Sequence, residues 1–296
     1  MSSSAHLVIQ GLPNELGLQV VRESVLVRGK VSRALRLRLV CKLWNSAVKA
    51  AFFALDLVIP RFSWRHPYRN EYIAHRVLTL IKPRWLALNL IRSVAERVLQ
   101  SNTPKKPADL KACVHDLCSI EQSFHDRGRE LVNWHVFAPW VGAGGAIPTE
   151  QQRVDQALLS AAAFYNDVEM AKQVLPHNAW LLSLDRRYDV SPLLGYPVAV
   201  AAWKGSIQVL NLFLEAIEAY SGSTDQARAT VILYAADGNQ LEALELGLEM
   251  DHALSWREVH LGLELTTDDR VLHCLLETAL AFTVASAWQS IKARRP

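Results

Sequence analysis

Apolar side chains recur with helical spacing along the first hundred residues. In LRLRLVCKLWN, residues 35–45, apolar and basic residues alternate at first, as in a half-buried strand, but the alternation fails after Leu39. Over the wider segment 31–53, Leu35, Leu39 and Leu43 recur every four residues beside a second stripe of Leu37, Val40 and Trp44. Neither Gly nor Pro interrupts this pattern, which predicts a helix with a wide apolar face. Segments 12–28 and 86–100 also have helical spacing, and the sequence predicts an all-α fold.

The C-terminal half contains a repeated pattern. The segments AAFYNDVEMAKQVL (162–175), AAWKGSIQVLNLFL (201–214) and AADGNQLEALELGL (235–248) align without gaps and start 39 and 34 residues apart. A weaker fourth copy is LELTTDDRVLHCLL (263–276). Paired alanines permit close helix packing, and Asn166, Gly205 and Asn239 suit the left-handed conformation that ends a helix. The pattern predicts α-hairpins that stack into a solenoid.

This spacing and the shape AAxxGxxxxLxxLL resemble divergent ankyrin repeats over about residues 154–280. Pro197 falls where that family has the proline of its TPLH motif, but Ala199 replaces the histidine, and hairpin turns of the GADVN type are missing. The resemblance implies binding of other proteins through the hairpin tips and the inner helices. Possible contact residues are Trp180, Arg186, Arg187, Tyr188 and Trp203.

A second resemblance lies near the N-terminus. Leu12-Pro13-x-Glu15-Leu16, followed by LVCKLWN at 39–45, resembles an F-box, the helical motif that docks on the Skp-type adaptor of cullin-based ubiquitin ligases. The resemblance covers about residues 10–57, with a basic connection at 26–33 that is longer than in compact members. It implies that the adaptor-binding residues are Leu12, Pro13, Leu16, Val20, Leu39, Val40, Cys41 and Trp44. Both Cys41 and Trp44 also suit the module's own core.

These patterns predict four parts of the chain. They are an F-box-like helical module at 1–57, a helical linker at 58–150, divergent ankyrin-type repeats at 151–280 and a C-terminal helix end at 281–296. The sign of the charge changes near residue 106. Residues 1–106 hold 18 basic and 5 acidic residues, and the remainder holds 14 and 24. Such asymmetry suggests modules with different partners.

The basic half suits either nucleic acid or an acidic protein surface. Nucleic-acid binding is disfavoured because the basic residues of segment 31–53 have no aromatic platform or reading element beside them. The cluster Arg61, Trp64, Arg65, Tyr68 and Arg69 is the part of the chain most like a nucleic-acid site, but packing between domains explains it better, because Trp and Arg also dominate protein contacts. Neither a membrane span nor a secretory signal is evident in the sequence. Four cysteines in 296 residues are too few for a disulfide scaffold. We therefore expect a cytoplasmic or nuclear protein.

The sequence offers no catalytic or cofactor motif. CVHDLC at 113–118 lacks the ligand spacing of a structural zinc site, and VGAGGAIP at 141–148 lacks the GxGxxG order. Motifs of the GxSxG, HExxH and P-loop types are missing from the sequence. We expect no enzymatic activity, no cofactor and no metal.

Together these patterns predict a non-enzymatic adaptor of protein–protein interactions. The F-box-like segment suggests a substrate receptor of a Skp–cullin–F-box ubiquitin ligase, with the repeats binding an unknown protein substrate. The combination resembles F-box/ankyrin-type proteins of fungi. The alternative is an ankyrin-type repeat scaffold without a ubiquitin-ligase link, in which the N-terminal helices cap the solenoid.

Overall fold

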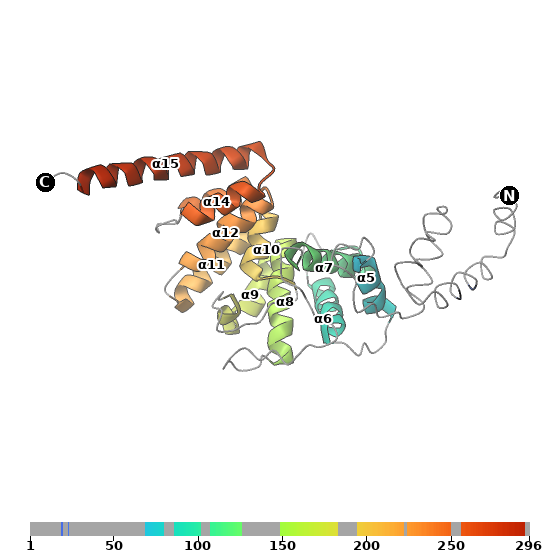
Figure 1. Ribbon diagram of the computed structural model, residues 1–296. Helices are drawn as coiled ribbons and strands as arrows, with labels where there is room; N and C mark the ends of the chain where they lie inside the picture. Colours follow the sequence, from blue (N-terminus) through green and yellow to red (C-terminus); the bar gives the residue numbers. More distant parts are fainter. Residues whose placement is uncertain are drawn as a thin grey trace, which may run out of the picture. The chain divides into compact units, whose positions relative to one another are not determined.

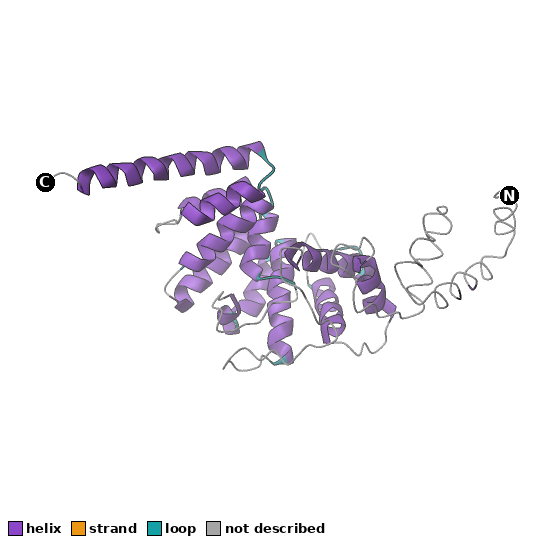
Figure 2. Ribbon diagram, in the orientation of Figure 1, coloured by secondary structure: helices purple, strands orange, loops and turns teal. Residues whose placement is uncertain are grey.

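The computed structural model describes residues 19, 23, 69–79, 86–101, 107–125, 149–182, 194–221, 224–249 and 256–293. All regular structure within these ranges is helical, and none of it is strand (Figure 2). The predicted all-α fold class is therefore confirmed. The chain divides into two compact units, Met1–Thr79 and Leu80–Pro296.

In the first unit the described helix is α5, Arg69–Thr79. Tyr72, Ile73, Ala74 and Val77 are buried in it, so more than half of the helix circumference is covered. Gln19 and Glu23, which lie in the segment predicted to be helical, have helical backbone and exposed side chains.

The described residues of the second unit form helices that follow one another in chain order (Figure 1). They are α6 (Leu86–Gln100), α7 (Leu110–His125), α8 (Glu150–Tyr165), α9 (Val168–Val174), α10 (Pro197–Lys204), α11 (Ile207–Ser221), α12 (Asp225–Asp237), α13 (Leu241–Glu249), α14 (Trp256–Leu265) and α15 (Asp269–Ala293), with short 3-10 helices at Leu175–His177 (η2) and Ala179–Leu182 (η3).

Helix α6 packs against α7 and α8. Its predicted apolar face is confirmed, since Leu88, Ile91, Ala95 and Val98 are all buried. At the edge of the α6–α8 contact, the Arg97 guanidinium lies 3.8 Å from the Asp155 carboxylate. Helices α6 and α7 thus belong to the same compact unit as the later hairpins.

From α8 onward the helices form successive hairpins: α8–α9, α10–α11, α12–α13 and α14–α15. The first helix of each hairpin contacts the first helix of the next, α8 with α10, α10 with α12 and α12 with α14. The six alanines of the aligned pairs have no exposed surface; they are Ala162, Ala163, Ala201, Ala202, Ala235 and Ala236. Their small side chains permit this close approach.

The starts of α8 and α10 follow ordinary capping rules. Thr149 caps α8 with a capping box, in which its hydroxyl accepts from the Gln152 N–H and the Gln152 side chain accepts from the Thr149 N–H. Pro197 occupies the first position of α10, where a missing N–H is tolerated.

Arg228 joins α12 to the end of α13. Its side chain is 4% exposed, and its Nε and Nη2 donate to the carbonyls of Gly247 at 2.7 Å and Leu248 at 3.0 Å. These carbonyls belong to the last turn of α13, where the helix dipole also favours a cation. The buried charge is thereby hydrogen-bonded to groups that the helix itself leaves without partners.

The second and third hairpins approach each other closely at Gly238. A Cβ atom at this position would overlap the backbone carbonyl of Trp203 at the end of α10. At Gly262 in α14, by contrast, a Cβ atom would lie 3.2 Å from Cδ1 of Leu275, a side chain that can move.

We predict that Gly238→Ala destabilises the fold by about 1–3 kcal/mol, because the α10 backbone has to shift to admit the methyl group. Gly262→Ala is the matched control, and its cost is partly offset by the higher helix propensity of alanine, about 1 kcal/mol. Urea denaturation of the two variants checks this. Equal midpoints for the two would contradict the close packing at Gly238.

Candidate protein-interaction site

The turns between the two helices of the first three hairpins have the same geometry. Asn166, Gly205 and Asn239 have φ of 54°, 66° and 54°, the left-handed conformation predicted for these positions. In each turn the N–H of this residue and the N–H of the next donate to the carbonyls of the alanine pair. The bonds are Asn166 to Ala163 (3.4 Å), Asp167 to Ala162 (2.8 Å), Gly205 to Ala202 (3.2 Å), Ser206 to Ala201 (2.9 Å), Asn239 to Ala236 (3.2 Å) and Gln240 to Ala235 (2.8 Å). This is the Schellman arrangement, in which a left-handed residue closes the helix.

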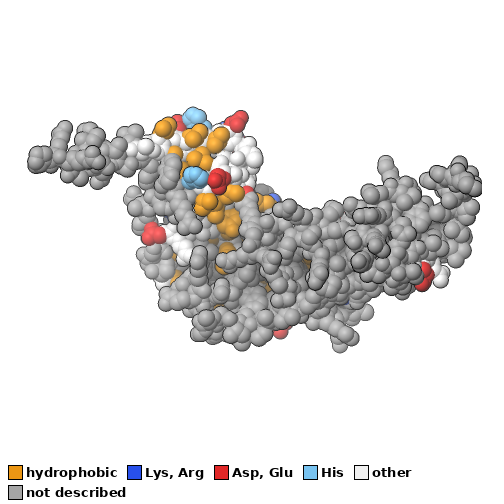
Figure 3. All heavy atoms as spheres, in the orientation of Figure 1, with side chains coloured by type: hydrophobic (Ala, Val, Ile, Leu, Met, Phe, Trp, Pro, Cys, Tyr) orange, Lys and Arg blue, Asp and Glu red, His pale blue; other side chains and the backbone are white. Residues whose placement is uncertain are grey.

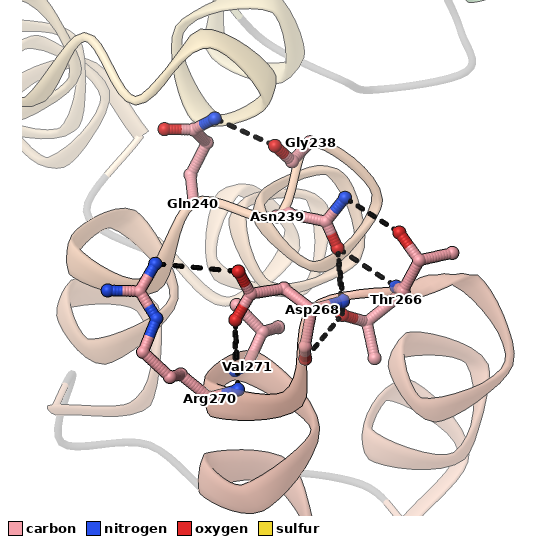
Figure 4. Close-up of polar contacts among 8 residues, drawn as sticks. Gly238, Asn239, Gln240, Thr266, Asp268, Arg270 and Val271 are labelled. Carbon is pink, nitrogen blue, oxygen red and sulfur yellow. Dashed lines mark hydrogen bonds and ion pairs between the residues drawn. The ribbon is translucent and has the colours of Figure 1, made fainter.

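The turn between α14 and α15 is built differently (Figure 4). Thr267 stands at the position of the left-handed residue, but among the described non-glycine residues only Asn166 and Asn239 have positive φ. The N–H groups of Thr267 and Asp268 donate to Oδ1 of Asn239 at 2.9 and 3.0 Å. The Thr266 hydroxyl also donates to this oxygen, and Asn239 Nδ2 donates to the Thr267 hydroxyl. One amide side chain of the third hairpin thus closes the turn of the fourth.

An aspartate starts the second helix of both the first and the fourth hairpin. Asp167 Oδ1 accepts from the N–H of Met170 at 3.0 Å, and Asp268 Oδ1 accepts from the N–H groups of Arg270 at 2.9 Å and Val271 at 3.3 Å. Hydrogen bonds from the side chain and backbone of Arg270 hold the pKa of Asp268 below its usual value. Asp268 holds the same position in the predicted fourth copy of the repeat as Asp167 holds in the first copy. The start of the second helix thus matches between the two copies, although the turn before it differs.

The turns of neighbouring hairpins adjoin one another. A Cβ atom at Gly205 would overlap the side chain of Gln240, whose Nε2 donates to the Gly238 carbonyl at 2.7 Å. Asn239 in turn binds 266–268, as described above. We call the residues 164–167, 203–206, 237–240 and 266–268 the turn edge.

The turn edge includes a cluster of two aromatic rings and a cation. Lys204 Nζ lies 4.3 Å from the ring centroid of Phe164 and 5.3 Å from that of Trp203. The lysine is exposed, and both rings are partly exposed. Cation–π contacts fix the lysine over the rings, and aromatic side chains held in this way are common anchors of protein interfaces.

Beneath this cluster, Tyr165 links α8 to α7. Its hydroxyl donates to Oδ2 of Asp116 at 3.0 Å and lies 3.7 Å from Sγ of Cys113. Burial raises the pKa of Tyr165 and raises that of the Cys113 thiol to about 11. Cys113 and Cys118, the cysteines of the CVHDLC segment, are both buried free thiols. A buried thiol with a raised pKa is a poor nucleophile. The contact of Tyr165 with Asp116 and Cys113 therefore stabilises the packing of α7 on α8 and is not suited to catalysis.

The predicted contact residues of the repeats are only partly described. Trp203 lies on the turn edge, and Trp180 is partly exposed in η3, whereas Arg186, Arg187 and Tyr188 lie outside the described residues. The predicted adaptor-binding residues Leu12, Pro13, Leu16, Val20, Leu39, Val40, Cys41 and Trp44 also lie outside them. Phe164 and Lys204 were not predicted, although Phe164 directly follows one alanine pair and Lys204 lies two residues after another.

Comparisons with models of protein families, with curated proteins and with solved structures gave no match to this chain. Within the described ranges, no three His, Cys, Asp or Glu side chains are grouped to hold a metal ion. None of the described helices combines the length and the apolar character needed to cross a bilayer. Within the described residues the geometry defines an all-α arrangement, in which the hairpins from α8 to α15 contact one another through their first helices.

We predict that Asn239→Gly destabilises the fold by about 1–3 kcal/mol, because the N–H groups of Thr267 and Asp268 lose their acceptor. Glycine retains the left-handed conformation, so the change isolates the side-chain hydrogen bonds. Asn166→Gly is the matched control, since Oδ1 of Asn166 is buried without a hydrogen-bond partner. Its removal is expected to be neutral or stabilising. Similar urea midpoints for the two variants would refute this difference.

We also predict that Cys113 resists alkylation in the native protein. At pH 8 a thiol with a pKa of about 11 forms little thiolate, and Cys113 is fully buried. The partly exposed Cys274 serves as the internal reference, although burial raises its pKa too. Pulsed iodoacetamide labelling followed by peptide mass spectrometry is expected to give Cys113 a rate at least about tenfold lower. Equal rates would mean that the α7–α8 contact opens readily.

Proposed function

We propose that this protein is a non-enzymatic adaptor of protein–protein interactions, a substrate receptor of a Skp–cullin–F-box ubiquitin ligase. In this proposal the F-box-like segment docks on the Skp-type adaptor. The helical hairpins, stacked as a divergent ankyrin-type solenoid, hold the protein to be ubiquitinated. The two tasks lie in different parts of the chain.

The observation that carries the proposal is the recurrence of one turn geometry along the turn edge. Asn166, Gly205 and Asn239 close three hairpins in the same way at the spacing of the sequence repeat. Successive first helices in contact bring the hairpin turns together into one extended edge, which is the kind of surface that repeat proteins use to bind other proteins.

The chemistry of the turn edge supports a protein as its ligand. Phe164 and Trp203 offer partly exposed aromatic surface, and Lys204 places a cation directly above it. A partner segment that combines an apolar side chain with a carboxylate would match this cluster. The non-enzymatic role rests on the sequence, which lacks catalytic motifs.

The link to a ubiquitin ligase rests on the order LPxEL followed by LVCKLWN. The basic character of residues 1–106, with 18 basic and 5 acidic residues, suits an acidic adaptor surface. The predicted contact residues are divided between the first helix and the VCKxW helix, so both have to be present for docking.

We predict that the full-length chain binds a purified Skp-type adaptor and that Leu12→Ala/Pro13→Ala/Trp44→Ala weakens binding by at least about tenfold, because apolar anchors dominate such interfaces. Isothermal titration calorimetry with the recombinant adaptor measures this. Glu23→Ala is the matched control, since Glu23 is an exposed helical residue of the same segment and is not a predicted contact.

A second control is Trp203→Ala/Lys204→Ala, which changes the turn edge and is expected to leave adaptor affinity unchanged. Circular dichroism and urea unfolding establish that each variant folds. If the folded wild-type chain fails to bind the adaptor, the ligase role is wrong. The remaining candidate is then a repeat scaffold without a ubiquitin-ligase link, for which the turn edge alone provides the binding surface.

A further inference from the structure

The turn edge carries an exposed cation that is not neutralised by any acidic group of the described residues. Lys204 is exposed at the end of α10, and within the described part of the chain its ammonium contacts two aromatic rings and forms no ion pair. The exposed Lys172, by contrast, lies 3.4 Å from the carboxylate of Glu169. The charge of Lys204 is therefore available to an anionic group of another molecule.

The two rings below Lys204 come from equivalent positions of the repeat. Phe164 and Trp203 each follow directly after the alanine pair, in the first and second aligned segments. Because α8 and α10 are in contact, these positions adjoin, and the ammonium lies within cation–π distance of both rings. The third and fourth segments have Asp237 and Leu265 at this position. Among the aligned segments, the aromatic pair is thus confined to the first two hairpins.

Packing from below fixes the position of this cluster. The ring of Phe164 meets that of Tyr165 edge to face, with 5.1 Å between their centroids. Tyr165 is buried and bonded to Asp116, so the ring on which Phe164 rests is itself held. A free lysine side chain loses much rotamer freedom when it binds a partner. At Lys204 part of this entropy is already lost in the folded chain, so the cation is preorganised for binding.

Four of the five large hydrophobic side chains that are exposed within the described ranges lie elsewhere, on α14 and α15 (Figure 3). They are Leu261, Leu272, Leu276 and Leu280. An apolar surface by itself does not define the charge of a partner, whereas a cation held over two rings does. The turn edge is therefore the surface from which the chemistry of a partner can be inferred.

The charge of the surrounding chain makes the attraction local. Residues 107–296 hold 14 basic and 24 acidic residues, so an acidic partner gains no general attraction from this part of the chain. Charge interactions in solvent are largely screened beyond about 8 Å at physiological ionic strength. An acidic segment is consequently drawn to the immediate surroundings of an unpaired cation such as Lys204.

We propose that Lys204 is the specificity-determining residue of the turn edge and selects partner segments in which an Asp or Glu side chain adjoins a large apolar one. The carboxylate binds the ammonium on the side away from the rings, and the apolar side chain packs on the exposed ring surface of Phe164 and Trp203. This inference rests on the part of the proposed function in which the turn edge binds a protein, and it names the chemistry of that protein. It does not depend on docking to the Skp-type adaptor.

Selection from a phage-displayed library of random linear peptides tests the proposal. Parallel selections use the full-length wild type and Lys204→Gln, and the bound peptides are sequenced. We expect the wild type to enrich peptides with Asp or Glu next to Phe, Leu or Trp, relative to Lys204→Gln. Acidic peptides held by the basic residues 1–106 bind both proteins alike, so the comparison removes them.

Fluorescence anisotropy with the most enriched labelled peptide then measures affinity. Lys204→Gln is expected to weaken binding at least about fivefold and Lys204→Glu at least about tenfold, because the carboxylate loses its counter-charge. Phe164→Leu keeps the charge and an apolar side chain but removes the cation–π contact, and we expect about threefold weaker binding. Circular dichroism and urea unfolding establish that each variant folds.

Lys111→Gln is the matched control, because Lys111 is an exposed lysine of α7 outside the turn edge. Leu280→Ser is the second control and changes the apolar surface of α15. Both are expected to bind the peptide like the wild type. The proposal is overturned if the selection yields no peptide that distinguishes the wild type from Lys204→Gln, or if the enriched peptides lack acidic residues. Equal weakening by Lys111→Gln and Lys204→Gln, or loss of binding in Leu280→Ser alone, overturns it too.

The adaptor titration separates this inference from the ligase role. Binding of the adaptor together with peptides that ignore Lys204 refutes the inference and leaves the ligase role intact. Peptides that depend on Lys204 in a chain that fails to bind the adaptor refute the ligase role and support the inference.

Discussion

Each first helix of a hairpin has to end abruptly and still find partners for its last backbone groups. The end of an α-helix leaves carbonyls without hydrogen-bond donors inside the helix, and a buried polar group without a partner costs free energy. At Asn166, Gly205 and Asn239 the left-handed backbone turns two N–H groups back onto the carbonyls of the alanine pair. This closure fixes the direction of the second helix, and the packing of the hairpins depends on it.

The alanine pairs serve two physical purposes at once. Their methyl groups are fully buried between neighbouring first helices, and their carbonyls accept the closing hydrogen bonds of the turn. Gly238 adds a further constraint, because its missing side chain admits the backbone of Trp203. A short stretch at the end of α8, α10 and α12 thus determines both the spacing of these hairpins and the geometry of their turns. The repeat is for this reason easiest to recognise there.

Local rules account for what the sequence predicted correctly. Helical periodicity gave the buried face of α6, and the preference of Gly and Asn for left-handed backbone gave the turn residues. The predicted contact Trp203 does lie on the turn edge, whereas the F-box-like residues stay predictions. The different roles of Asn166 and Asn239 were not predictable, because they depend on what the next hairpin offers. Only after Asn239 does a turn follow that lacks its own left-handed residue.

The same dependence on neighbours explains why the fourth hairpin is distinctive. Its turn is closed by Asn239 of the hairpin before it, and its outer leucines have no cover within the described part of the chain. In stacked hairpins, stability is approximately the sum of each unit and its contacts with its neighbours. Because Asn239 closes its turn, the fourth hairpin depends on the third for a contact that each earlier hairpin makes with its own left-handed residue.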